Sequence, residues 1–465
     1  MQQIAQILEQ AARGYDGYVE LRYHDKRTRS LSVEQGKLER SQQRRRMGVG
    51  VRVLRGGGWG LASTGSLDLE ALRHAIEQAH RAARAASVVG ARRVPALAPA
   101  ELARGNFDQP GVREIRERSL EEKIALAVGL ESKIRTASAR VASASCWYNE
   151  IFEDKAIVTS DGASASFRLV RPEIRMAAVA EKNGELATGS QAIGVTGGWQ
   201  CLFRNGEGDV FAGRAAQTAT DLLGKKGPEG GRATVILAPS IVGLLVHEAI
   251  GHTVEADFVL SGSVAAGKLG RPVASELVTL CDSGGSEFYA GAAGTIPVDD
   301  EGVVAGRTEI IKNGVLRSYL HNRESAAAFG VEPTGNARAW EYCDQPLIRM
   351  RNTYMEPGES SLEEMIEGTE SGFLLDGPRN GQADSTGEFM FGVQEARRID
   401  KGKLGDLVKG VSISGIAFDV LASVDAVSDA FRWDLGSGYC GKGQPAKVDA
   451  GGPYIRCRAV LGGTQ

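Results

Sequence analysis

Residues 246–257 read Val246-His247-Glu248-Ala249-Ile250-Gly251-His252-Thr253-Val254-Glu255-Ala256-Asp257 and place two of the six histidines and three carboxylates within a dozen positions. The segment around them is apolar, so these polar side chains need a specific partner. Two neutral imidazoles can hold a zinc ion, and a glutamate beside the first can take a proton from the water that such an ion activates. The stretch therefore predicts a metal site on a buried helix.

The spacing of the two histidines is unusual. In the common protease motif His-Glu-x-x-His they lie four apart and share one helical face. His247 and His252 lie five apart, and at about 100° per residue they diverge by roughly 140° on a regular helix. The sequence therefore predicts a helix that is widened, as in a π-bulge, or that loosens at Gly251. The alternative is a regular helix, on which one of these two histidines is exposed, the other lies in the core, and the two never meet.

A catalytic zinc ion usually takes three protein ligands, so one ligand is still missing. Glu255 and Asp257 are close in sequence and could serve as ligands or as outer carboxylates. His321 lies near the end of a predicted strand, and Cys440 lies in the glycine-rich stretch 436–443, where a thiolate could approach an ion closely. A small buried apolar residue is nevertheless the commoner role of a lone cysteine. The remaining cysteines lack such a context and are expected to be core or surface thiols: Cys146, Cys201, Cys281, Cys343 and Cys457.

The composition is that of an ordinary globular chain, with 465 residues, 42% hydrophobic and 24% charged, and a net charge of -3. This balance argues against nucleic acid or an anionic membrane as the main partner. No apolar run is long enough to span a bilayer, and no secretory signal opens the chain. Six scattered cysteines without a Cys-x-x-Cys pair predict free thiols in the reducing cytoplasm.

Hydrophobic periodicity predicts an α+β fold of two domains, with a helix-and-sheet domain over residues 1–226 and a mostly β domain over 227–465 that carries the metal helix. The boundary is the glycine-rich segment 227–231. Helices are expected near 4–14, 67–86, 119–135, 210–223 and 361–368, and from Pro239 through the histidine motif. Strands are expected over 19–24, 28–33, 47–54, 233–237, 308–311, 315–319 and 391–400, with hairpin turns at Asp161-Gly162, Asn183-Gly184, Asn313-Gly314 and Lys401-Gly402.

Three further histidines are predicted not to bind metal. His24 alternates with the apolar Val19, Leu21 and Tyr23, so it is expected on the charged, solvent-facing side of a half-buried strand. His74 and His80 lie six apart on the helix 67–86 and are expected on its exposed surface.

The ordered motifs of the second half resemble the TldD/PmbA (TldE) family of metallopeptidases, specifically its TldD branch. They cover about half of the chain, and the N-terminal half fits through a looser pattern of helix, sheet and glycine. Ala256 stands where a glycine is common in the family. The resemblance is carried by residues 247–257, Thr334-Gly335-Asn336-Ala337-Arg338, Arg351-Asn352-Thr353 with Pro357-Gly358, Thr386-Gly387-Glu388-Phe389 running into Phe391-Gly392-Val393, Cys440-Gly441-Lys442, and Gly462-Gly463-Thr464.

The resemblance implies a Zn²⁺ site of His247, His252 and Cys440 with Glu248 as general base, and so favours Cys440 over the other candidates. It also implies a dimer, formed with a PmbA/TldE-like paralogue that lacks the metal motif or with a second copy. The expected activity is cleavage of unfolded or extended peptides. Two alternatives stay open: an enzyme that tailors a peptide natural product by another reaction, and a non-catalytic peptide-binding partner subunit.

Overall fold

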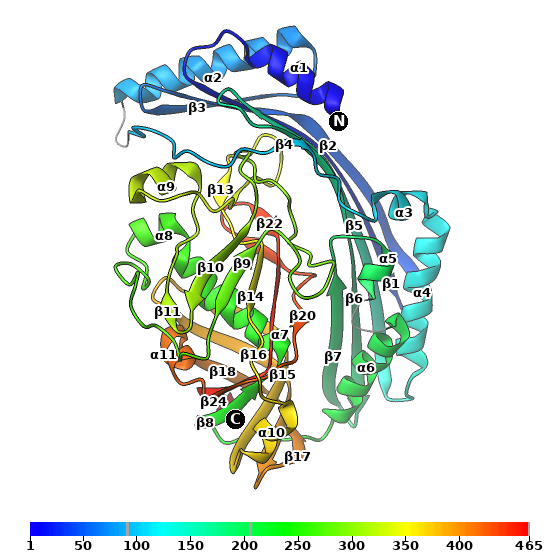
Figure 1. The fold of residues 1–465 in the computed structure, drawn as a ribbon. Helices are drawn as coiled ribbons and strands as arrows, with labels where there is room; N and C mark the ends of the chain where they lie inside the picture. Colours follow the sequence, from blue (N-terminus) through cyan, green and yellow to red (C-terminus); the bar gives the residue numbers. More distant parts are fainter. Residues whose placement is uncertain (90–92, 204–206, 464–465) are drawn as a thin grey trace.

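The computed structural model describes residues 1–89, 93–203 and 207–463, and Thr464 of the closing motif lies outside them. Its N-terminal half is built on one seven-stranded sheet with four very long strands (Figure 1). The strand order is β3-β2-β1-β5-β6-β4, with β7 also paired to β6, and only the β4–β6 pair is parallel. The strands are β1 (Tyr18–Glu34), β2 (Lys37–Arg55), β3 (Gly58–Thr64), β4 (Arg104–Asn106), β5 (Val141–Thr159), β6 (Ser164–Lys182) and β7 (Glu185–Gly194).

Helices cover the outer, apolar face of this sheet. At one end α1 and α2 pack on Val19, Leu21 and the neighbouring strands, and at the other end α4 and α6 pack on Leu31 and Val33. Alternation along β1 directs these odd-numbered residues to the same face. The helices are α1 (Gln2–Ala12), α2 (Leu69–Val89), α3 (Val112–Glu117), α4 (Leu120–Thr136), α5 (Trp199–Leu202) and α6 (Gly208–Asp221).

The inner face of the sheet carries many polar side chains that are nevertheless buried, because the C-terminal half packs against them. Arg52 pairs with Glu301 at 2.7 Å, and Lys155 pairs with Asp300 at 2.9 Å. His24, predicted on a solvent-facing side, is only 3% exposed and lies 3.0 Å from Glu153. That prediction was wrong because alternation of charged residues does not show whether water or a second layer of protein covers the charged face.

The C-terminal half contains two larger sheets. One has the order β11-β10-β9-β14-β23-β20, and the other runs β15-β8-β24-β18-β16-β17, with an additional β15–β16 pairing that closes five strands into a ring. The first consists of β9 (Leu280–Ser283), β10 (Arg307–Lys312), β11 (Val315–Leu316), β14 (Asn352–Met355), β20 (Arg432–Trp433) and β23 (Asp449–Gly452). The second consists of β8 (Gly231–Leu237), β15 (Ser371–Ala383), β16 (Glu388–Asp400), β17 (Lys403–Val408), β18 (Val411–Ile416), β19 (Ala426–Val427) and β24 (Ile455–Gly463).

Short elements complete this half. Two-stranded ladders join β12 (Ala337–Arg338) to β13 (Leu347–Ile348) and β21 (Tyr439–Gly441) to β22 (Pro445–Lys447). The helices are α7 (Pro239–Leu244), α8 (Ala256–Leu260), α9 (Arg323–Phe329), α10 (Leu362–Glu367) and α11 (Ala417–Ala422). In the described part of the chain, no helix is both long and apolar enough to cross a membrane.

The mixed α+β class is confirmed, and the strands of residues 18–194 form a sheet separate from those of residues 231–463. The domain boundary at 226/227 stays a prediction. Two element predictions were wrong. The strands expected over 19–24 and 28–33 are parts of the single strand β1, because the intervening Asp25-Lys26-Arg27 continues the extended backbone. The strand expected over 315–319 comprises only Val315–Leu316. The hairpin turns at Asn183-Gly184, Asn313-Gly314 and Lys401-Gly402 are confirmed, since both residues of each turn have positive φ.

Candidate metal centre

The histidine motif lies in a helix that changes its winding. Pro239 is the first residue of α7, and the segment Leu245–Gly251 that follows α7 is π-helical. A π-helix joins residues i and i+5, so two side chains five apart lie on nearly the same side. The predicted distortion near Gly251 is therefore confirmed, and it turns His247 and His252 toward each other, with ring centroids 5.5 Å apart.

The motif helix is held in the centre of the C-terminal half. Its apolar side chains, including Val242, Val246 and Ile250, are fully buried. They pack between strands β14 and β23 of one sheet and β15 and β16 of the other. Gly251 is required there, because a Cβ atom at this position would lie 1.9 Å from the Sδ atom of the buried Met350.

Cys440, which is 188 residues farther along the chain than His252, completes the cluster. Its Sγ atom lies 3.1 Å from Nε2 of His252, and one ligand atom each of His247, His252 and Cys440 fall within 4.8 Å of one another. Both His247 and Cys440 are buried, whereas the His252 side chain is 22% exposed. Access from solvent is thus possible on one side of the cluster only.

The donor atoms fit a metal ion. Neither ring nitrogen of the buried His247 has a hydrogen-bond partner among the described residues, although buried polar groups are normally satisfied. Two imidazoles and one thiolate form a donor set that binds zinc well and leaves a coordination position open. The residues present are therefore suited to a catalytic ion.

The two histidines favour the ionised form of Cys440. Burial alone raises the pKa of the Cys440 thiol, but the adjacent His247 and His252 outweigh burial and lower this pKa to about 5. The pKa of His252 is also shifted. Burial lowers this pKa, but Cys440 and Glu255 outweigh burial and raise it to about 10. These contacts favour the thiolate, the form of Cys440 that binds metal, whereas His252 has to release its proton to become a ligand.

Of the other candidate ligands, Glu255 lies behind the ring of His252. The side chain of His321 lies away from the cluster. Oε2 of Glu255 is 3.1 Å from Nδ1 of His252 and 3.0 Å from Nζ of Lys442. Asp257 pairs with the same Lys442 at 2.7 Å and is not part of the cluster. The ring of His321 contacts the Ser325 hydroxyl at 3.0 Å instead. Glu255 thus has the position of an outer carboxylate that orients a metal-binding histidine.

Glu248 borders the cluster without joining it. Its Oε2 atom lies 3.9 Å from Nε2 of His252, and its side chain is 30% exposed. A carboxylate at this position can reach a molecule that enters from the open side, which is the position a general base requires.

The N-terminal half positions the loop that carries Cys440. Gly194 at the end of β7 and Gly436 meet so closely that a Cβ on Gly436 would lie 1.9 Å from the Gly194 carbonyl oxygen. Arg175 donates to the Ser437 carbonyl at 2.6 Å, and Tyr439 donates to Glu173 at 3.1 Å. Sequence reasoning missed these contacts, because they join residues more than 240 positions apart and no local pattern marks them.

Comparisons with known proteins identify the family of this chain. The PmbA/TldA metallopeptidase models match in chain order, with domain 1 at residues 19–83, the central domain at 113–223 and the C-terminal domain at 230–462. A metalloprotease of Methanothermobacter thermautotrophicus is 35% identical over 460 residues, which cover 96% of each chain. A zinc metalloprotease TldD homolog of Saccharolobus solfataricus is 33% identical over 350 residues, covering 73% of this chain and 75% of its own.

A solved structure from Thermotoga maritima, described as a candidate modulator of a DNA gyrase, has a TM-score of 0.81, 21% identity and 99% coverage of both chains. At this identity the likeness shows the fold alone. Two histidines, a cysteine and a neighbouring carboxylate are side chains that suit the metallopeptidase class. Given the matches over the whole chain, it belongs to the PmbA/TldD family.

Proposed function

We propose that this chain is a zinc-dependent peptidase that cleaves unfolded or extended peptides, with His247, His252 and Cys440 as ligands and Glu248 as general base. The convergence of these three donors beside a carboxylate carries the proposal. The name of the Saccharolobus relative, a zinc metalloprotease, supports the choice of metal.

Zn²⁺ held by the three residues would supply Lewis acidity for the scissile carbonyl and for the attacking water. Glu248 takes the proton from that water and delivers it to the leaving amine. Glu255 keeps the His252 ring in place through the contact to Nδ1, while Lys442 holds Glu255 from the other side. The chain thereby fixes its ligands through a charged network instead of through the ion alone.

The substrate is expected to lie extended along a strand edge, because pairing to the backbone suits peptides of varied sequence. The proposal also includes a dimer, with a PmbA/TldE-like paralogue or a second copy, and a cytoplasmic setting. All six cysteines are free, in agreement with a reducing compartment. Mass spectrometry of an unfolded peptide incubated with the protein would reveal a tailoring reaction as a mass change other than hydrolysis.

The test is Glu248→Gln, which removes the base and preserves the shape of the side chain. Hydrolysis should fall by about 10²- to 10⁴-fold, while zinc content, measured by elemental analysis, should equal that of the wild type. A fully active Glu248→Gln protein would refute the mechanism. A wild-type chain without zinc would instead favour the non-catalytic partner subunit.

A further inference from the structure

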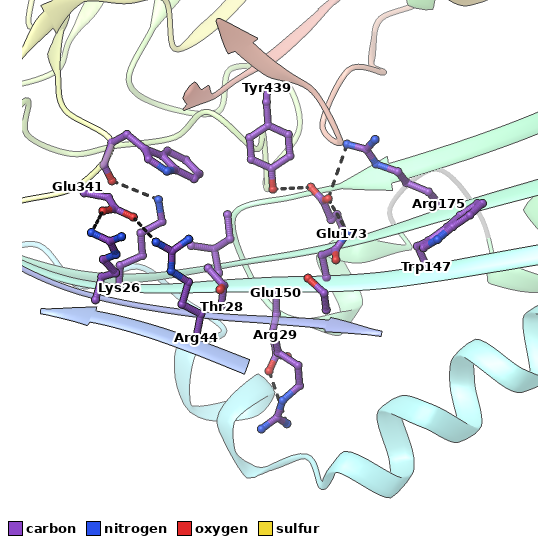
Figure 2. Close-up of a pocket in the computed structure, with 15 residues that line it drawn as sticks. Lys26, Thr28, Arg29, Arg44, Trp147, Glu150, Glu173, Arg175, Glu341 and Tyr439 are labelled. Carbon is purple, nitrogen blue, oxygen red and sulfur yellow. Dashed lines mark hydrogen bonds and ion pairs between the residues drawn. The ribbon is translucent and has the colours of Figure 1, made fainter. Parts of the chain in front are cut away.

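A cavity of about 600 Å³ lies between the inner face of the long sheet and the C-terminal half (Figure 2). The sheet contributes side chains of β1, β2, β5 and β6, and the C-terminal half contributes Trp340, Glu341 and Tyr439. Tyr439 directly precedes Cys440 in β21, and successive side chains of a strand point to opposite faces. The cavity is therefore separated from the metal centre by the thickness of one strand.

Cations dominate the sheet side of this cavity. Arg44 and Arg46 of β2 share the single carboxylate of Glu341, at 3.9 Å and 3.0 Å. The ammonium group of Lys26, which is 4% exposed, contacts the carbonyl oxygen of Trp340 at 3.2 Å and the ring of Trp340 instead of a carboxylate. Burial lowers the pKa of Lys26 to about 7, although Glu153 and Glu341 act against it. Even with Lys26 neutral, the four arginines that line the cavity outnumber its three glutamates.

A free strand edge borders the same cavity. β3 pairs only with residues 49–55 of β2 and ends at Thr64. Residues 37–47 of β2 pair with β1 on one side, and in the described part of the chain no strand covers their other side. Residues 37–46 are all exposed. Such an edge offers its amides and carbonyls to an added strand.

We propose that this edge and cavity bind an acidic segment of an extended polypeptide, which adds to β2 as a further strand and directs carboxylates toward Lys26, Arg44 and Arg46. The inference deepens the proposed peptidase function, on which it rests, by naming acidic extended peptides as its substrate class. A segment held here lies beside β21 and hence beside the metal centre.

The charges and the free strand edge together favour an acidic peptide over a second copy of this chain and over nucleic acid. Pairing of β2 with the same strand of a second copy would set arginine against arginine, because Arg40 and residues 44–46 crowd one short stretch. Nucleic acid has no backbone amides and carbonyls that could pair with a strand edge.

Binding is measured by fluorescence anisotropy on the full chain carrying Glu248→Gln, so that no cleavage intervenes. The probes are a labelled unstructured acidic peptide and its Asn/Gln version. The acidic peptide should bind about ten-fold tighter, and Arg44→Gln/Arg46→Gln should abolish this preference. The matched control is Arg45→Gln, whose side chain is similarly exposed but lies on the opposite face against Asp25; it should change Kd by less than about two-fold.

Hydrogen exchange locates the bound segment. Amides of residues 38–46 should gain protection when the acidic peptide is added, whereas residues 49–55, already paired with β3, should not change. Equal binding of both peptides, equal loss in Arg45→Gln, or equal affinity for single-stranded DNA would each overturn the inference. Because binding is measured without hydrolysis, these outcomes are independent of whether the metal centre cleaves peptides.

Discussion

At the scale of single residues, Gly251 decides whether the metal centre can form. It ends the π-helical turn, and its missing side chain lets the motif helix touch the buried Met350. The adjacent His252 is then aimed at His247 and Cys440, with Glu255 behind it. Two neighbouring features, a small residue and an outer carboxylate, thus control the orientation of one ligand.

Gly251→Ala should disturb both stability and metal binding, because the added Cβ forces Met350 and the motif helix apart. A loss of about 1–3 kcal/mol is expected for such overpacking, visible in thermal unfolding, together with weaker zinc binding. Met350→Ala in the same chain should restore part of the loss. If the single variant binds zinc as tightly as the wild type, the close contact is not what aims His252.

Glu255→Gln should weaken zinc binding about 10- to 100-fold, because an outer carboxylate that fixes a histidine ligand has effects of this size. Asp257→Asn is the matched control, since Asp257 contacts the same Lys442 but is not part of the ligand cluster. Competition against a zinc-binding dye gives both affinities. Equal weakening by the two variants would assign the effect to Lys442 instead of to His252.

At the scale of elements, the site depends on a loop that three separate segments hold. The buried Arg349 donates to the Cys440 carbonyl at 2.6 Å, while Gly194 and Arg175 hold the residues before Cys440 from the other half. The helix supplies two ligands with a fixed orientation, and the loop supplies the third only as long as these contacts persist.

Gly436→Ala should therefore reduce zinc affinity although Gly436 is no ligand, because a Cβ there collides with the backbone of β7. Gly441→Ala is the control: it is next to Cys440, yet nothing lies within 4 Å of its Cβ position. Zinc titration of both variants is the measurement. Similar affinities in the two would show that the Gly194–Gly436 contact does not position the loop.

The sequence predicted the motif helix, its distortion and the hairpin turns, since each rests on local spacing or on residues that tolerate positive φ. It could not predict what covers the inner face of β1, so His24 was misplaced. From the residues alone Cys440 was one candidate among four, and only the family resemblance favoured it. Contacts such as Gly194–Gly436 join distant segments, and neither residue carries a chemical signal of its partner.

At the scale of the whole molecule, the two halves meet through an apolar cluster, in which Phe167 and Leu169 pack with Ile296 and Val298, and through a buried charged face. Glu20, Arg22, His24 and Arg52 are all at most 3% exposed there. Such an interface is specific because each charge needs its partner, and it is sensitive to pH because burial opposes any change of charge.

His24 should make the protein less stable in mild acid. Burial, assisted by Lys155 and opposed by Glu153, lowers the pKa of His24 from 6.5 to about 4. Between these values the unfolded chain binds a proton that the folded chain does not, so stability falls as the pH falls, by about 3 kcal/mol in total. His24→Gln should remove this part of the pH dependence in calorimetric unfolding. An unchanged pH dependence would show that His24 does not titrate in this window.

The decisive measurement on the metal centre is anomalous diffraction at the zinc edge, on crystals of the full chain with one equivalent of zinc. We expect a single peak within about 2.0–2.3 Å of a nitrogen of His247, a nitrogen of His252 and Sγ of Cys440, and no such peak in Cys440→Ala. A peak bonded to Glu255 or His321 in place of Cys440, or no peak at this cluster, would contradict it.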